Sequence, residues 1–283
     1  MRVLITGAGG MLARDLIPVL SGRGHETLAP NESELDITDL HTVSTIVESL
    51  KPELIINCAA YTRVDDAEVE EVKALQVNGH GVENLCMACR SGNIPLLHFS
   101  TDYVFDGTKP TPYSIHDKPN PINAYGRSKL TGEKHILKLM DKFYIIRTSW
   151  LFGLHGNNFV ETMLSLAKSQ KSINVVNDQR GCPTWTVHLS QAIAELIETG
   201  RYGIYHITNS GSVTWYEFAR EIFRLSGIHM NVIPVTSDRF PRPAKRPHNS
   251  VLDPYPLYDV LKRNMPSWQG ALAGYLKLRN LKE

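Results

Sequence analysis

The chain has 283 residues, of which 42% are hydrophobic and 21% are charged, as in an ordinary globular protein. A formal net charge of +1 gives no global field that would attract nucleic acid or an anionic membrane. No apolar run approaches the roughly 20 residues that span a bilayer, and the apolar stretch at the N-terminus is too short for a secretory signal. We therefore expect a cytoplasmic protein with no nucleic-acid or membrane partner.

Short apolar segments alternate with amphipathic ones from the N-terminus onward. In chain order, the hydrophobic spacing predicts strands at 2–6, 25–29, 53–58, 95–100 and 143–149, and helices at 11–20, 40–50, 70–90 and 123–139. Strands that alternate with helices form right-handed βαβ units, and such units build a doubly wound parallel sheet of the α/β class.

After residue 150 this alternation becomes looser. Short predicted strands at 173–176, 203–208 and 232–235 mix with predicted helices at 187–199 and 215–225. We expect residues 1–150 to form the parallel-sheet domain and residues 151–283 to form mainly a smaller, mixed α/β substrate lobe. The helices between 187 and 225 are expected to pack back on the sheet. No flexible linker separates the two parts, so we expect a shared interface with a cleft.

The segment Gly7-Ala-Gly-Gly10 follows the first predicted strand and precedes a helix. Gly7 suits the tight turn, and Gly10 lets the backbone approach a pyrophosphate at the positive N-terminus of the helix. The same pattern also occurs in plain glycine-rich turns. Because strand, turn and helix are all in place, the segment predicts a Rossmann-type domain that binds NAD or NADP, with Ala13 at the third glycine position.

The end of the second predicted strand bears on the choice of cofactor. An acidic residue there would bind the 2′-hydroxyl of NAD, whereas this sequence has Pro30-Asn31. Arg14 could meet the 2′-phosphate of NADP, and it could equally be a solvated charge on a helix. The sequence therefore favours NADP(H) and leaves NAD(H) open.

Tyr125 and Lys129 stand four residues apart on a predicted helix, and Thr101 follows an earlier strand. Residues i and i+4 share a helix face, so the phenol and the ammonium would point the same way. A phenol with the ordinary pKa of about 10 is a weak acid, and a nearby cation is expected to lower that pKa. Beside the Thr101 hydroxyl, such a phenol suits proton exchange with a carbonyl/alcohol oxygen. An interfacial tyrosine and a solvated lysine are the alternative interpretation.

Cys86 and Cys89 have the spacing of a redox or metal-binding pair. A zinc site would need a second pair or suitably spaced histidines, and none follows. Residues 82–90 have the composition of a buried helix, so both cysteines are interpreted as packing residues. The sequence predicts no metal site.

Longer motifs extend over nearly the whole chain. They lie at 57–65, 100–107, 125–129, 147–153, 177–184 and 246–250. In this order they resemble the dTDP-4-dehydrorhamnose reductase family, a branch of the extended short-chain dehydrogenase/reductases. The resemblance implies that NAD(P)H reduces the C4 ketone of dTDP-4-dehydro-β-L-rhamnose, which gives dTDP-β-L-rhamnose for a surface polysaccharide.

The resemblance also implies roles for individual residues. Tyr125 would be the general acid, Lys129 would tune it, and Thr101 would donate a hydrogen bond to the C4 oxygen. The positions implied at the cofactor are Gly7, Gly10, Met11, Leu12, Asp36, Ile37, Ala59, Ala60, Tyr61, Phe99, Tyr125 and Lys129. The positions implied at the sugar nucleotide are Thr101, Asp102, Trp150, Asn158, Gln179 and Arg246.

Some members of this family bind Mg²⁺ through carboxylates at a dimer contact. Asp15 lies near one such position, but the full set of carboxylates is not found, so Mg²⁺ is not expected here. The sequence leaves open whether the protein is a monomer or a homodimer.

Two other functions fit the same fold. The segment 100–107 also resembles a non-catalytic, NADP-binding regulatory subunit, that of methionine adenosyltransferase. The presence of Trp150, Asn158 and Gln179 favours a sugar site instead. A nucleotide-sugar epimerase or dehydratase is the other alternative, although Tyr103 stands where a dehydratase would have a glutamate after Thr101-Asp102.

Overall fold

The computed structural model describes residues 1–281, and its centre is a six-stranded sheet. The strands are β1 (Arg2–Thr6), β2 (Glu26–Leu28), β3 (Leu54–Asn57), β4 (Leu96–Thr101), β5 (Phe143–Thr148) and β10 (Gly203–His206). All neighbours pair in parallel, in the order β10-β5-β4-β3-β1-β2. The chain runs from β1 outward to β2 and then returns to the other side of β1, which creates a topological switch between β1 and β3. The predicted doubly wound α/β fold is confirmed.

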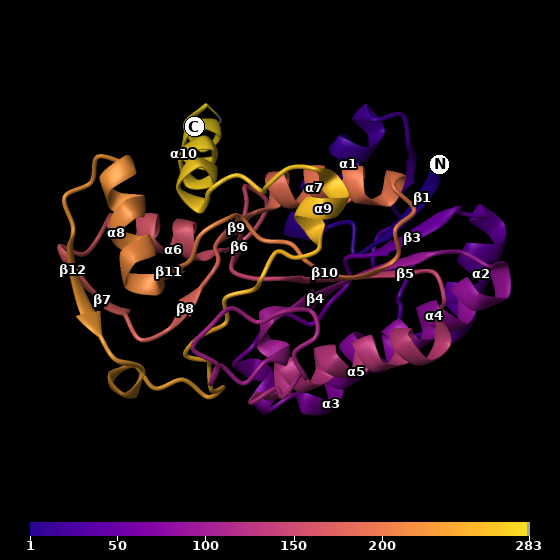
Figure 1. The fold of residues 1–283 in the computed structure, drawn as a ribbon, viewed down its shortest axis with the longest axis horizontal. Helices are drawn as coiled ribbons and strands as arrows, with labels where there is room; N and C mark the ends of the chain where they lie inside the picture. The colour runs from indigo at the N-terminus through magenta and orange to yellow at the C-terminus, as the bar shows by residue number, and fades with distance from the viewer. Residues whose placement is uncertain (282–283) are drawn as a thin grey trace.

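Helices cover both faces of this sheet (Figure 1). On one face lie α1 (Met11–Gly22), α7 (Thr186–Glu198) and α9 (Leu257–Leu261), and on the other lie α2 (Leu40–Leu50), α4 (Gly81–Gly92) and α5 (Ala124–Leu139). Successive side chains of a strand point to opposite faces, so Val3 and Ile5 enter one hydrophobic core and Leu4 enters the other. Burial on both faces explains why β1 is an unbroken apolar run.

The single helix predicted at 70–90 is wrong in one respect, because a π-helical turn interrupts it. The segment consists of α3 (Glu71–Leu75), the turn η2 (Gln76–His80) and α4. Asn78 in this turn is buried; its Oδ1 accepts a hydrogen bond from Tyr61 N, and its Nδ2 donates to Tyr61 O and Ser128 Oγ. These contacts join the turn to the loop after β3 and to α5, and helical spacing carries no sign of them.

Most of the second half of the chain surrounds a hydrophobic core of its own (Figure 1). Its helices are α6 (Phe159–Leu166), α8 (Trp215–Leu225) and α10 (Trp268–Asn280), and its short strands pair as β6 (Leu151–Phe152) with β9 (Thr184–Trp185), β7 (Ser172–Val176) with β12 (Asn231–Val235), and β8 (Arg180–Gly181) with β11 (Val213–Thr214). The helix α10 was not predicted, because Gly270 and Gly274 weaken its helical pattern. Gly274 is required by packing: a Cβ there would lie 2.9 Å from the ring of Trp185.

The two halves of the chain interlock. The helix α7 packs against α1, and β10 extends the main sheet beside β5. The chain leaves the sheet after β5 and returns to it through α7 and β10, so the sheet contains residues from both sides of position 150. The division into two domains at residue 150 stays a prediction. Among the described residues, no helix combines the length and the apolar composition that crossing a membrane demands.

Candidate active site

The glycine turn after β1 forms a cradle that is open on one side. Gly7 has a φ of 63°, and a Cβ there would lie 2.5 Å from the backbone N of Ala59, just after β3. A Cβ on Gly9 would meet nothing within 4 Å. Gly10, the N-cap of α1, supplies no side chain to the first helical turn, whose backbone N–H groups are left for an external acceptor. These features fit a phosphate group at the helix N-terminus.

The other residues predicted at the cofactor have varied surroundings. Those next to the glycine turn are Met11, Leu12, Ala59 and Ala60. The Tyr61 hydroxyl donates a hydrogen bond to Glu70 Oε2 at 2.6 Å, so it is already engaged. Asp36 is exposed, as an adenine-side contact requires, whereas Ile37 and Phe99 are buried in the two hydrophobic cores. At these two buried positions the cofactor contact stays a prediction.

Thr101 ends β4, and the first turn of α5 brings Tyr125 to it. The N-cap Asn123 accepts a hydrogen bond from Gly126 N at 2.7 Å, which fixes where α5 begins. Gly126 lacks a side chain for a steric reason, since a Cβ there would lie 2.2 Å from Tyr103 O. The helix therefore approaches the strand end closely enough for the Thr101 hydroxyl to act on the pKa of Tyr125.

Burial controls the acidity of Tyr125. Loss of solvent raises its pKa to about 12, and hydrogen bonding from Thr101 opposes the rise. The predicted lowering of this pKa is wrong in direction. The cost of desolvating a phenolate is the largest effect, and the neighbouring charge that acts on Tyr125 is that of Asp102, which raises the pKa further. A phenol in this state stays protonated at neutral pH, as a general acid requires.

Lys129 is also buried, with 2% of its surface exposed. Burial lowers its pKa to about 8, although Glu133 and Cys58 act in the opposite direction. Its Nζ lies 3.3 Å from Nε2 of His98 on β4, and His98 Nδ1 lies 2.9 Å from Nδ2 of Asn57 on β3. A buried polar chain thus leads from the end of β3 to the predicted catalytic lysine.

Hydrogen bonds around Asn57 assign the tautomer of His98. Asn57 Oδ1 accepts from the Thr6 hydroxyl and from Ala59 N, so Asn57 Nδ2 is the donor to His98 Nδ1. Burial, together with the Lys129 charge, holds the pKa of His98 well below its ordinary value, and the neutral ring carries its proton on Nε2. This N–H group faces Lys129 Nζ. The sequence analysis missed His98, although a lone histidine within an apolar strand was an available signal.

Asp102 follows Thr101 and is 2% exposed. Its Oδ1 accepts a hydrogen bond from Thr101 Oγ1 at 3.0 Å, whereas its Oδ2 has no hydrogen-bond partner among the described residues. Burial raises the pKa of this carboxyl to about 7, and the nearby Ser250 and Thr101 hydroxyls oppose the rise. An ionised Asp102 therefore holds the hydrogen that Thr101 is expected to offer to a ligand oxygen.

A buried ion pair fixes the middle of α5 to the sheet. Glu133 accepts hydrogen bonds from Nε and Nη2 of Arg147 on β5, at 2.9 and 2.7 Å, and from the Ser100 hydroxyl on β4. Glu133 is 0% and Arg147 2% exposed. The helix that carries Tyr125 and Lys129 is thus tied to both strands beside the site by a bidentate, directional pair.

Arg246 reaches the site from the second half of the chain. Its Nη1 and Nη2 donate to Oδ1 and Oδ2 of Asp65 at 2.5 and 2.8 Å. The Arg246 guanidinium holds the pKa of Asp65 below its ordinary value. Arg246 also lies close to Tyr103, whose ring meets the Tyr125 ring edge-on, with centroids 6.0 Å apart. The structure therefore brings Arg246 next to the predicted catalytic cluster.

Two further residues predicted at the sugar are held by partners in the second lobe. Trp150 has a φ of 48° and stacks on Trp215, with ring centroids 3.4 Å apart. Gly181 makes room for this stack, since a Cβ there would lie 2.5 Å from the Trp150 ring. Gln179 Nε2 donates to Ser237 Oγ at 2.8 Å, which leaves its carbonyl oxygen as the group available to a ligand.

Asn158 has a capping role that the sequence analysis did not foresee. It is the N-cap of α6, where its Oδ1 accepts a hydrogen bond from Glu161 N. Its Nδ2 donates to Gly153 O and Gly156 O. Both amide hydrogens are used within the chain and shape the loop before α6, and the substrate contact of Asn158 stays a prediction.

Comparisons with known proteins place the chain in a family. The family model described as the RmlD substrate binding domain matches residues 1–280. The chain is 47% identical over 253 residues to the dTDP-4-keto-6-deoxy-D-glucose reductase of Streptomyces niveus, covering 89% of this chain and 88% of that protein. It is 44% identical over 285 residues to the dTDP-4-dehydrorhamnose reductase of Aggregatibacter actinomycetemcomitans, covering 96% and 97% of the two chains. The chain belongs to the dTDP-4-dehydrorhamnose reductase family.

A solved structure of this family extends the similarity to three dimensions. The dTDP-4-dehydrorhamnose reductase of Bacillus anthracis, in complex with NADP, is 41% identical to this chain, with a TM-score of 0.95 over 98% of this chain and 99% of that one. Membership in the dTDP-4-dehydrorhamnose reductase family confirms the resemblance found in the sequence motifs. The chain is therefore an NAD(P)H-dependent oxidoreductase.

Proposed function

We propose that the protein reduces the C4 ketone of dTDP-4-dehydro-β-L-rhamnose to the alcohol of dTDP-β-L-rhamnose, with NADPH as the reductant. The observation that carries the proposal is the set formed at the carboxyl end of β4 by the buried Thr101 and Lys129 and the partly buried Tyr125. The glycine turn follows β1 and lies along the same edge of the parallel sheet, at the topological switch where such folds bind their ligands. A hydride carrier and a proton donor can thus meet at one carbonyl.

When bound, NADPH supplies the hydride, and residues of this chain handle the proton. The Thr101 hydroxyl has a single hydrogen, which it donates to Asp102 before a substrate binds. Turned to the C4 oxygen, this hydrogen would form the hydrogen bond that holds the oxygen against Tyr125. As negative charge develops on that oxygen, the phenolic proton of Tyr125 moves to it. In its ammonium form Lys129, which lies one helical turn beyond Tyr125 on the same face of α5, would stabilise the resulting phenolate.

Residues at the start of the chain support NADPH rather than NADH. The cradle of Gly7 and Gly10 would hold the pyrophosphate against the first turn of α1. Arg14 on the same helix is exposed, and the end of β2 offers Pro30-Asn31 instead of a carboxylate for a free 2′-hydroxyl. The NADP complex of the Bacillus anthracis relative agrees with this choice.

The sugar nucleotide would lie between the catalytic cluster and the second lobe. Arg246 offers a planar fork to the diphosphate, and Trp150 and Gln179 offer an aromatic face and a carbonyl oxygen to the sugar nucleotide. Every residue of this site comes from one chain, so we propose that a single protomer is sufficient for turnover, whether the protein is a monomer or a homodimer.

The test is NADPH oxidation, followed by absorbance, with two ketone substrates in parallel. These are dTDP-4-dehydro-β-L-rhamnose and dTDP-4-keto-6-deoxy-D-glucose, the ketone named for the Streptomyces niveus relative. We expect the higher kcat/KM for the rhamnose precursor, with dTDP-β-L-rhamnose identified by NMR. Preference for the glucose ketone would reassign the substrate. Cofactor binding without turnover on either ketone would favour a regulatory subunit, and conversion of a sugar without net NADPH oxidation would favour an epimerase.

A further inference from the structure

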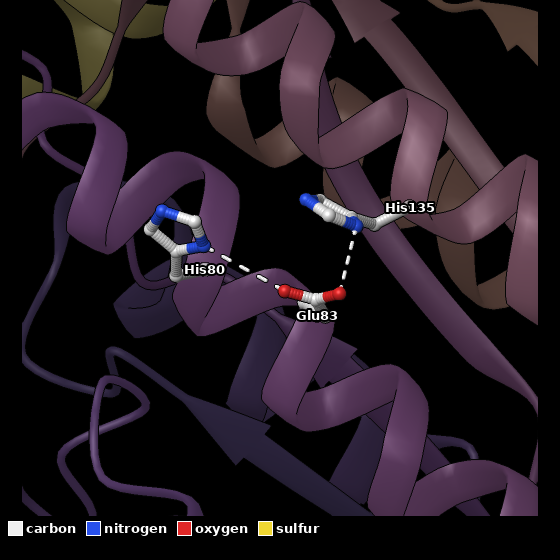
Figure 2. Close-up of side chains that lie close together, drawn as sticks. All are labelled: His80, Glu83 and His135. Carbon is white, nitrogen blue, oxygen red and sulfur yellow. Dashed lines mark ion pairs between the residues drawn. The ribbon is translucent and has the colours of Figure 1, made fainter.

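Two histidines and a glutamate converge on the outer side of the helices below the sheet. His80 ends the turn η2, Glu83 lies in the first turn of α4, and His135 lies on α5. Figure 2 shows the two imidazoles approaching the carboxylate from different helical segments. His80 Nδ1 lies 3.6 Å from Glu83 Oε2, and His135 Nδ1 lies 3.3 Å from Glu83 Oε1. Each carboxylate oxygen thus faces the imidazole of a different histidine.

The spacing of these atoms fits a metal ion. One ligand atom from each of the three side chains can be chosen so that all lie within 4.8 Å of one another. Zinc binds nitrogen and oxygen at about 2.0–2.2 Å, so two ligands of a tetrahedral site lie about 3.3–3.6 Å apart. The two nitrogen-to-oxygen contacts of 3.3 and 3.6 Å lie in this range. At most 4.8 Å separates the chosen imidazole nitrogens, so an ion would have to draw the two rings closer together.

The donor set selects the class of ion. Imidazole nitrogen suits zinc, nickel, copper and iron, whereas magnesium and calcium prefer oxygen ligands alone. The side chains of His80, Glu83 and His135 are 57%, 30% and 21% exposed, so an ion can reach them from solvent. Three protein ligands leave a further position for water.

We propose that His80, Glu83 and His135 form a binding site for a divalent transition-metal ion of the zinc class. The bound ion would join α4 to α5, two helices that already pack together. His135 is six residues beyond Lys129 on α5, about 9 Å along the helix axis. The site is therefore separate from the catalytic cluster, and its occupancy acts on the stability of the helix layer rather than on the proton chemistry.

The experiment is a titration of the purified, metal-free protein with Co²⁺, followed by displacement with Zn²⁺. We expect one equivalent of Co²⁺ to give visible absorption bands of nitrogen and oxygen coordination, without the charge-transfer band that a cysteine thiolate would add. Zn²⁺ should remove these bands and raise the Tm. In His135→Asn and His80→Asn, affinity should fall by at least the roughly 10–100-fold that lesser changes around a metal site cause.

The matched control is His229→Asn, an exposed histidine outside the cluster, which should bind Co²⁺ as the unaltered protein does. NADPH oxidation by all three variants should match the unaltered protein, which shows that each one folds. If His135→Asn does not fold, His80→Asn carries the test alone, because His80 is the most exposed of the three ligands. Absence of Co²⁺ binding, binding that survives in both cluster variants, or a thiolate band would overturn the proposal.

Discussion

The catalytic side and the sugar side of this molecule hold their polar groups in different ways. On the catalytic side, Thr101, Lys129 and Glu133 are 6%, 2% and 0% exposed, and strands of the main sheet fix them. On the sugar side, the side chains of Arg246 and Asp65 are 18% and 27% exposed and mainly hold each other. Proton chemistry is therefore built into the interior of the fold. The recognition that we propose would depend on partly exposed groups that join two parts of the chain.

The largest effect is expected from Tyr125→Phe, which removes the proton donor and keeps the ring. We expect kcat to fall by about 10²–10⁴-fold, the usual contribution of a positioned general acid. Cofactor affinity, measured by NADPH fluorescence, should change little, because the phenol acts on the substrate oxygen. The control is Tyr202→Phe, which alters an exposed tyrosine away from the site. If Tyr125→Phe kept a kcat within a few fold of that of the unaltered protein, another group would have to be the proton donor.

A stability effect of similar size is expected from Glu133→Gln. Removing one partner of a buried ion pair costs about 3–5 kcal/mol, because the remaining Arg147 charge is left buried without compensation. The measurement is the free energy of unfolding in urea. Glu71→Gln is the matched control, since Glu71 is 54% exposed and pairs with Arg127 on the same helix α5. That change should cost at most about 1 kcal/mol, and equal losses in the two variants would remove the contrast between interior and surface.

The parts of the site that the sequence predicted are those set by local spacing. The glycine turn, the pair Tyr125 and Lys129, and Thr101 each lie at the start or end of a predictable strand or helix. Periodicity indicates where such elements begin and end, and the α/β architecture then places the carboxyl ends of the strands along one edge. The doubly wound sheet followed from the same alternation of apolar segments.

The parts that it missed depend on contacts between residues far apart in the chain. Arg246 and Asp65 are 181 positions apart, and no local pattern indicates that they pair. His98 contacts Asn57 and Lys129 through pairing of strands and packing of a helix, which only the folded sheet creates. The predicted lowering of the Tyr125 pKa failed for a similar reason, because burial cannot be read from a four-residue spacing.

A smaller effect is expected from Arg246→Lys. A lysine keeps the charge and loses the planar fork that both Asp65 and a diphosphate can bind. We expect KM for the sugar nucleotide to rise about 10-fold, the loss of one charge-assisted hydrogen bond, with kcat changed far less. Arg242→Lys is the control, since Arg242 is 52% exposed and only 4.0 Å from Asp65 at its nearest. If kcat fell in Arg246→Lys and KM stayed constant, Arg246 would act on the chemical step rather than on binding of the sugar nucleotide.

Asp102→Asn is expected to change how stability depends on pH. The folded carboxyl has a pKa of about 7, against an ordinary value of 3.8, so between these values the folded state keeps a proton that the unfolded state has released. More protons bound in the folded state mean that stability falls as pH rises, by at most about 1.4 kcal/mol per pH unit. The asparagine variant lacks this group. The stability of the unaltered protein minus that of the variant, measured by urea unfolding, should therefore decline from about pH 4 to pH 7 and level off above it.

Parallel curves of stability against pH for the two proteins would show that Asp102 ionises as an exposed carboxyl does. In that case a carboxylate would hold the neighbouring Thr101 at neutral pH. Burial would then shift the pKa values on the catalytic side less than the contrast in exposure with the sugar side implies.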